Sequence, residues 1–343
     1  LLWPLLLKNR LGSKYAMSVY FIFLSTVIAF AFQLLVLPNY APVINSIMLG
    51  RIVLALPILT ILFCIIWPGK FVESNFFIEN IFKLFLFICI IESVFLILGA
   101  YSSYLSLVGF QEYMSSKNTS SGFAFGFFGY RIITPLFNAS VGGVVLAFLF
   151  GFYCLTGQRK LAMVTLIPLI FTVSKAGYII ALIFLIFKRF SSYGFLIACF
   201  LYVGLALFVS NIDTSIFPFP DIVLKHLGSV DYHMLGLITG MQHFLLPVGL
   251  GNAGTVPGVD MPELIGRESG FGVGLGTSGI FYLIAFLMSG FALVHEFGKS
   301  GLLMVSGYTM VALMTESAAS FYVWVLLFAL FFNCAKKYGF RLN

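Results

Sequence analysis

Residues 159–189 read RKLAMVTLIPLIFTVSKAGYIIALIFLIFKR, an apolar stretch that begins and ends with a pair of basic residues. One straight membrane helix would place the two basic pairs on opposite sides of a membrane, whereas basic loops are normally cytoplasmic. Two short helices that break at residues 174–177 would keep both pairs on the cytoplasmic side. The stretch therefore predicts a broken helical hairpin with Lys175 at its bend, partly within the membrane.

The remainder of the chain has the composition of a membrane protein. Of its 343 residues, 61% are hydrophobic and 9% are charged, which is too apolar for a soluble domain of this size. Apolar runs of about 20 residues recur between charged or turn residues, as expected for helices that cross a bilayer. We expect an all-α, polytopic membrane protein.

Counting the apolar runs predicts about eleven membrane segments, of which the first, residues 1–7, is the truncated end of a helix. The predicted organisation is N-terminal membrane helices at residues 1–210, one large loop at 211–277, and C-terminal membrane helices at 278–343. One predicted span covers residues 275–297 and turns back at Lys299. Residues 301–334 then repeat the broken-hairpin pattern, with a polar bend at Glu316.

Most of the 19 Lys and Arg residues fall in turns that this topology places in the cytoplasm, and most carboxylates fall outside it. The positive-inside rule therefore explains the net charge of +7, and we expect no nucleic-acid partner. The five cysteines lie within apolar runs, which predicts neither a disulfide framework nor a cysteine-based metal site. The four histidines are not at metal-ligand spacing, so we expect no metal and no cofactor.

The loop at residues 211–277 is the long polar segment of the chain, and a long loop beside a helical bundle suits catalysis. Within it, residues 231–246 have the periodicity of a helix. His233, Gly236, Gly240 and His243 share one face of that helix. Two interpretations remain open: a sugar or phosphate lies along the glycine face, or the face packs against a neighbouring membrane helix.

Arg267, Glu268 and Ser269 end this loop immediately before a membrane segment. Arg267 and Glu268 could form a structural ion pair, or a phosphate clamp beside a general base. Glycines surround them and would admit a bulky ligand: Gly270, Gly272, Gly274, Gly276 and Gly279. The glycine-rich turn at residues 247–254 lacks the context of a nucleotide-binding motif.

Five other charged residues of interest lie in or near the membrane. Lys175 is a candidate functional residue, because a charge within a membrane is costly, or it snorkels to the outer surface. Arg131 is either part of a site or an interfacial anchor with Tyr130. Glu79 and Lys83 are spaced to pair on one helix, and we assign them, with Glu92 of the same span, a structural role.

Three places in the chain resemble the superfamily of O-antigen polymerases and O-antigen ligases of bacterial surface polysaccharide assembly. Ser174 and Lys175 in a broken helix look like the family's Ser-Arg/Lys pair. His233, followed by PVGLG at residues 247–251, looks like the pattern of its large periplasmic loop. Glu268-Ser269, followed by Gly279-Ile280, looks like a signature of the polymerases. The resemblance covers about residues 129–287, and ligases place a histidine where Glu268 stands, which favours a polymerase.

The resemblance implies a GT-C-like glycosyltransferase in the bacterial inner membrane, with its active site facing the periplasm. It would transfer a growing glycan from undecaprenyl diphosphate to the next lipid-linked repeat unit, with inversion and without a metal. The implied partners are this lipid-linked oligosaccharide, membrane lipid and a chain-length regulator protein. An O-antigen ligase is the alternative within the class, and a lipid-linked oligosaccharide flippase or another transporter is the alternative outside it.

The implied roles follow the needs of that reaction. The leaving diphosphate requires fixed cations, and the candidates are Lys175, Arg131 and Arg267. The attacking hydroxyl requires a base, for which Glu268 is the first candidate and His233 or His243 the second. Further substrate contacts are expected from the loop residues Gly249, Gly251, Asn252 and Ser269.

Overall fold

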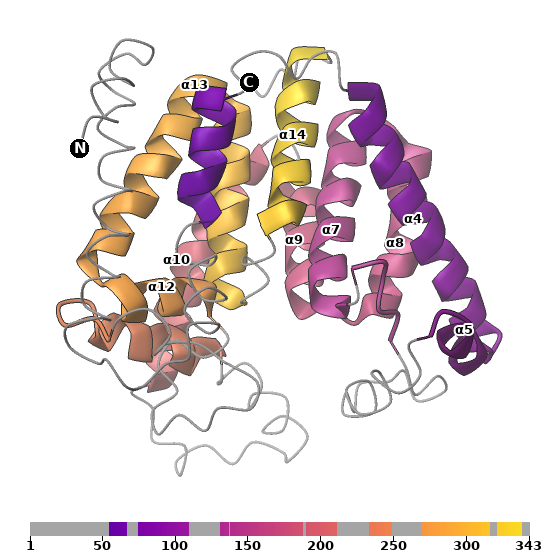
Figure 1. The fold of residues 1–343 in the computed structure, drawn as a ribbon, viewed down its shortest axis with the longest axis horizontal. Helices are drawn as coiled ribbons and strands as arrows, with labels where there is room; N and C mark the ends of the chain where they lie inside the picture. Colours follow the sequence, from indigo (N-terminus) through magenta and orange to yellow (C-terminus); the bar gives the residue numbers. More distant parts are fainter. Residues whose placement is uncertain are drawn as a thin grey trace. The chain divides into compact units, whose positions relative to one another are not determined.

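The structure is a computed structural model that describes residues 55–66, 75–109, 131–136, 138–187, 190–210, 233–248, 269–315 and 321–337 (Figure 1). Within these ranges every regular element is a helix and no residue belongs to a β-strand, which confirms the predicted all-α class there. The chain divides into two compact units, which we name after their main helices. The α7 unit comprises residues 71–191 and 326–343, and the α13 unit comprises residues 1–70 and 192–325.

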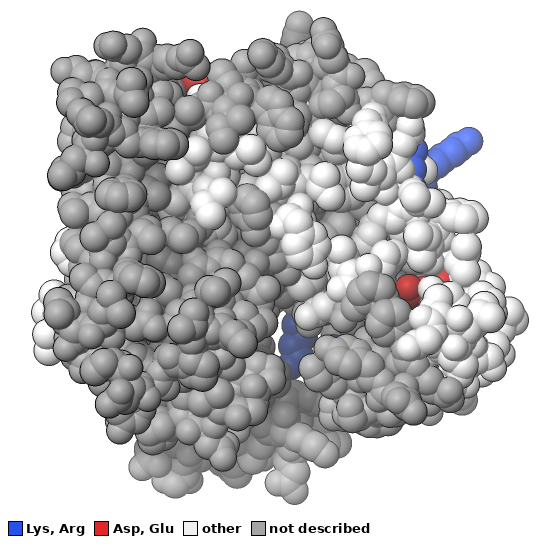
Figure 2. All heavy atoms as spheres, viewed as in Figure 1, with Lys and Arg blue, Asp and Glu red and all other residues white. Residues whose placement is uncertain are grey.

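Two of the described helices are long and apolar enough to cross a membrane, Phe77–Ile97 and Ile280–Met314. Five shorter apolar helices accompany them: Ala55–Cys64, Ala139–Leu155, Lys175–Phe187, Ser191–Leu207 and Tyr322–Asn333. Large apolar side chains such as Phe87 and Phe200 are exposed, as on surfaces that contact lipid. Most of the described residues visible in Figure 2 are uncharged, with a few Lys, Arg, Asp or Glu side chains among them. These features support a membrane protein, and the count of eleven segments stays a prediction.

The α7 unit contains α4 (Asn75–Ile97), α5 (Tyr101–Leu107), α7 (Ala139–Leu155), α8 (Arg159–Thr172), α9 (Lys175–Phe187) and residues 326–337 of α14 (Phe321–Lys337). α7 packs closely against both α8 and α9 (Figure 1). Nearly all residues of α7 are buried. Apolar helices in lipid gain most from close van der Waals contact, which small residues permit. Gly143 and Gly151 supply such contact, because a Cβ on either would overlap a side chain of α9 or its cap.

The order of these contacts fixes the directions of the three helices. Gly143, near the start of α7, lies against Ser174 at the break, and Gly151, near the end of α7, lies against the ring of Phe184 near the end of α9. α7 and α9 are therefore parallel, and α8 runs back between them in the chain. Arg159 and Phe187 consequently lie at the same end of the unit, as the predicted broken hairpin requires.

The α13 unit contains the helix from Ala55 that ends in the π-helical turn η1 (Ile61–Ile66), most of α10 (Ser191–Ser210), a short helix at residues 233–242, α12 (Gly270–Ser278), α13 (Ile280–Met314) and the start of α14. α13 consists of two helices, since Gly298 has φ 56° and ψ −128°, a conformation that suits glycine. Beyond it the chain reverses, so that Gly301 packs on the backbone of Leu293, and Gly290 faces Val305. The predicted turn between Phe297 and Lys299 is thus confirmed.

The predicted continuous span at residues 275–297 is wrong at its start. α12 begins at Gly270, and the chain breaks at Gly279, where φ is 58°. The backbone N–H of Ile280 then donates to the carbonyl oxygen of Phe244 at 3.0 Å, which holds the start of α13 against the preceding loop. Hydropathy carries no signal for this break, because the residues on both sides of Gly279 are apolar or small.

Candidate functional site

Three consecutive residues build the break between α8 and α9. Val173 adopts a left-handed conformation, with φ 50° and ψ 35°, and ends α8. The buried Ser174 hydroxyl accepts the N–H of Gly177 at 3.2 Å, as a helix-capping side chain does, and donates to the carbonyl of Ser140 at 3.3 Å. Lys175 is the first residue of α9 and is exposed. The structure therefore places Lys175 at the bend that the sequence predicted.

Residues 131–134, which we name the strap, lie beside this break just ahead of α7. Three consecutive backbone N–H groups of the strap are held by three different helices. Ile132 donates to the carbonyl of Phe171 in α8 at 3.0 Å. Ile133 donates to the hydroxyl of Tyr101 in α5 at 2.9 Å, and Thr134 donates to Oε2 of Glu92 in α4 at 3.0 Å. The strap is therefore fixed to the α7 unit along its length.

Arg131 begins the strap and so lies at the same end of the α7 unit as Lys175. Its Nε is buried and has no hydrogen-bond partner among the described residues. Burial lowers the pKa of the guanidinium, although arginine stays protonated at neutral pH. A buried N–H of a cation that lacks a partner is unfavourable, and an anion could satisfy it.

The helix ends add to this positive potential. α7 and α9 are parallel, so the N-termini of both lie at the end that carries Lys175 and the strap. Each helix N-terminus carries roughly half a positive charge, which adds to the positive charge of Lys175. The C-terminus of α8 offsets part of this potential. The balance favours binding of an anion such as a phosphate group.

Glu92 is a feature that the sequence interpretation did not recognise as part of a site. Its side chain is 2% exposed and lies within the apolar α4. Besides the strap, the hydroxyls of Tyr101 and Tyr104 donate to its two carboxyl oxygens, both at 3.4 Å. These partners lie 9 to 42 residues away in sequence, so local spacing gives no signal, and only the rarity of a carboxylate in an apolar run could have indicated the site.

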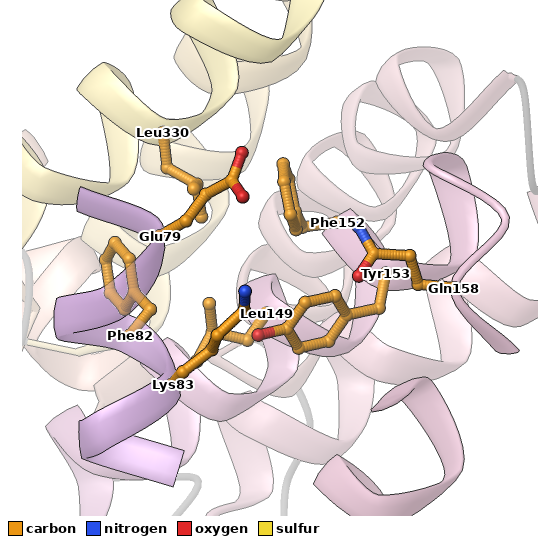
Figure 3. A pocket seen from close by; sticks show the side chains of 8 residues that line it. All are labelled: Glu79, Phe82, Lys83, Leu149, Phe152, Tyr153, Gln158 and Leu330. Carbon is orange, nitrogen blue, oxygen red and sulfur yellow. The ribbon is translucent and has the colours of Figure 1, made fainter. Parts of the chain in front are cut away.

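Glu79 and Lys83, the predicted structural pair, lie on α4 far from the strap. They line a small pocket with Tyr153 of α7 and Gln158, which precedes α8 (Figure 3). Gln158 follows the end of α7, whereas the strap precedes its start. The pocket therefore belongs to the opposite end of the α7 unit from Arg131 and Lys175.

The glycine face of the helix at residues 233–242 is occupied by protein. A Cβ on Gly240 would overlap the backbone of Gly272 in α12, and a Cβ on Gly272 would overlap the backbone of Gly236. Of the two interpretations of this face, packing against a neighbouring helix is therefore correct, and a sugar lying along it is not. Gly274 likewise contacts the ring of Tyr282, so these two α12 glycines serve packing rather than ligand entry.

His233 and His243 lie toward opposite ends of this short helix, roughly 15 Å apart at an ordinary helical rise. His233 is partly buried, and Nδ1 of His243 lies 3.3 Å from the carbonyl oxygen of Leu246. The described residues contain no group of three or more His, Cys, Asp or Glu side chains that could hold a metal ion. The two histidines thus do not form one catalytic cluster.

Ser269 is fully buried at the start of α12. Its hydroxyl accepts the N–H of Gly272 at 3.0 Å and donates to the carbonyl oxygen of Leu313 at 3.0 Å. It therefore ties the end of the loop to the last turn of α13. This geometry gives Ser269 a structural role, while its predicted substrate contact stays untested.

The other predicted site residues of the large loop lie outside the described residues, namely Glu268, Arg267, Gly249, Gly251 and Asn252. No family model, no curated protein and no solved structure matches the chain.

Proposed function

We propose that this chain is a membrane-embedded glycosyltransferase that polymerises a bacterial surface polysaccharide from polyprenyl-diphosphate-linked repeat units. The observation that carries the proposal is the position of Arg131 and Lys175 at one end of the α7 unit, beside the break between α8 and α9. Two cations and two helix N-termini gathered beside an apolar helix suit a ligand with an anionic head and a hydrocarbon tail.

The proposed reaction is an inverting displacement at the anomeric carbon of the donor glycan. A hydroxyl oxygen of the acceptor repeat unit forms the new bond to that carbon, and the bond from the carbon to the diphosphate oxygen breaks. The electron pair leaves with the diphosphate, whose growing charge Arg131, Lys175 and Arg267 stabilise. The acceptor's proton passes to Glu268, or to His233 or His243 in its place.

The apolar helices suit the lipid part of this donor. α4 and α10 expose large apolar side chains, among them Phe77, Phe87 and Phe200, which can contact a polyprenyl tail. The site would face the periplasm of the inner membrane, and a chain-length regulator protein is a proposed partner. An O-antigen ligase would use the same donor and differ in its acceptor.

A transporter of lipid-linked oligosaccharide is the second candidate, because the chain has helix breaks at Val173 and Gly279. Discontinuous membrane helices with exposed helix ends are common at the substrate sites of transporters. The two classes differ in a product: a polymerase makes longer glycans, whereas a transporter leaves the repeat unit unchanged.

Deletion of the gene and gel analysis of the surface polysaccharide test the proposal. A polymerase predicts that the ladder of chain lengths collapses to a single repeat unit. Loss of all capped lipid would instead support a ligase or a flippase. The decisive complement is reconstitution of the purified chain with a lipid-linked repeat unit, because only a polymerase then yields lipid-linked oligomers.

A further inference from the structure

We infer that Glu92 is a positioning residue that holds Arg131 in place for a polyprenyl diphosphate. The inference rests on the proposed function and concerns the chain of contacts from α4 through the strap to Arg131. Glu92 acts through the backbone and touches no substrate.

Three helices anchor the backbone of the strap. Its N–H groups at Ile132, Ile133 and Thr134 are held at 3.0, 2.9 and 3.0 Å by Phe171, Tyr101 and Glu92. Of these three acceptors, Glu92 is the side-chain carboxyl group, and its Oε2 accepts from both the Thr134 N–H and the Tyr101 hydroxyl. Glu92 therefore supports two of the three anchors.

The conformation of the strap is unusual at Thr134. Thr134 has φ 61°, which is unfavourable for a β-branched residue. Its side chain is fully buried against Gly142 of α7. Such a conformation persists where its surroundings enforce it, and the bond to Glu92 is made by the N–H of this same residue.

The anchored strap carries Arg131 at its start. Arg131 directly precedes the three anchored residues, and its Nε is buried without a partner among the described residues.

Burial is the main factor that raises the pKa of Tyr104 to about 12, and burial likewise raises the pKa of Tyr101. Both tyrosines therefore remain protonated donors to Glu92 at neutral pH, and the network stays assembled.

A second carboxylate of α4, Glu79, provides a matched control for Glu92. Glu79 lies on the same helix and lines the pocket at the opposite end of the α7 unit (Figure 3). It lies at the end of the unit away from the strap, so we expect it to have no influence on Arg131. Glu79→Gln is therefore the control for removing a carboxylate from α4.

The test measures binding of two lipids to the full-length purified chain in nanodiscs: undecaprenyl diphosphate and undecaprenol, which lacks phosphate. Glu92→Met removes the acceptor at similar size and should weaken diphosphate binding roughly tenfold, while leaving undecaprenol binding unchanged. Glu92→Gln keeps an acceptor for Thr134 and should lose only about two- to threefold. Tyr101→Phe should weaken binding more than Tyr104→Phe, because only Tyr101 bonds the strap directly.

A double-mutant cycle with Arg131→Ala decides between positioning and a general role in folding. If Glu92 acts through Arg131, Glu92→Met should add nothing to the loss caused by Arg131→Ala. Additive losses, or equal weakening for undecaprenol, would overturn the inference. If Glu92→Met does not fold, Tyr101→Phe takes its place in the cycle. A loss from Tyr101→Phe that adds to the loss from Arg131→Ala would then overturn the inference. If Arg131→Ala alone leaves diphosphate binding unchanged, the diphosphate role of this site in the proposed function fails instead.

Discussion

The hydroxyl of Ser269 lies 3.0 Å from the carbonyl oxygen of Leu313, which joins the residue that precedes α12 to the end of α13. The same hydroxyl caps α12. Ser269→Ala should lower the free energy of unfolding by roughly 0.5–2 kcal/mol, measured as a reduced thermal midpoint in detergent. Ser103→Ala, at an exposed serine of α5, is the control. A variant with unchanged stability but lost activity would instead give Ser269 a substrate contact.

The helix contact between residues 233–242 and α12 predicts a strong effect of a single methyl group. Gly240→Ala would place its Cβ against the backbone of Gly272, which cannot move as a flexible side chain can. We expect overpacking to destabilise the protein by roughly 1–3 kcal/mol and to reduce the yield of folded chain. Gly204→Ala in α10 has open space around it and should be neutral. Equal behaviour of the two variants would contradict the packing described here.

The two cations predict a charge-specific loss of polymerisation. Arg131→Ala and Lys175→Ala should each slow chain extension on the order of tenfold or more, because each removes charge-assisted bonds to the diphosphate. Lys175→Arg should retain more activity than Lys175→Ala. Arg159→Ala, at the opposite end of α7, is the control. Normal polysaccharide ladders from both alanine variants would place the diphosphate elsewhere.

Glu268 is the predicted base of the reaction. Glu268→Gln keeps the size of the side chain and should reduce chain extension roughly 10²–10⁴-fold with normal expression. Glu268→Asp should be intermediate, and Glu263→Gln in the same loop is the control. If the residue only pairs with Arg267, exchanging the two residues should restore activity. Full activity in Glu268→Gln would move the role to His233 or His243.

The reversal between α8 and α9 predicts the sidedness of three positions. In a cysteine-free chain, Arg159→Cys and Phe190→Cys should both react with an impermeant thiol reagent only after permeabilisation. Lys175→Cys, at the opposite end of α7, should react from outside. Phe190 is chosen for labelling because its side chain is exposed, whereas that of its neighbour Ser191 is buried. Labelling of residues 159 and 190 from opposite sides would refute the hairpin.

The sequence predicts a helix break correctly where charged residues flank the break. The break at residues 173–175 lies between two basic pairs, and the turn at Gly298 precedes Lys299, so topology alone predicts both. The break at Gly279 has no flanking charge, and it is accompanied by a backbone contact with Phe244 more than 30 residues earlier. Such a contact has no signature in local periodicity.

The candidate site also contains features that the sequence indicates and features that it does not. Lys175 and Arg131 could be named from sequence, because charge near an apolar run is unusual. Their common location at one end of α7 follows from the hydrogen bond between Ile132 and Phe171, which the sequence does not encode locally. Glu92 was assigned with Glu79 and Lys83 because all three share one helix, yet its partners come from α5 and the strap.

In the predicted multi-pass topology, the conformation of Gly298 also decides whether α13 crosses the membrane once or twice. A straight helix of the length of α13, 35 residues, would extend roughly 50 Å, against a hydrocarbon thickness of roughly 30 Å. Its mismatch with the bilayer would be large, and every segment after it would exchange sides. In the predicted multi-pass topology, the positive φ of Gly298 thus determines on which side of the membrane the helix after α13 begins.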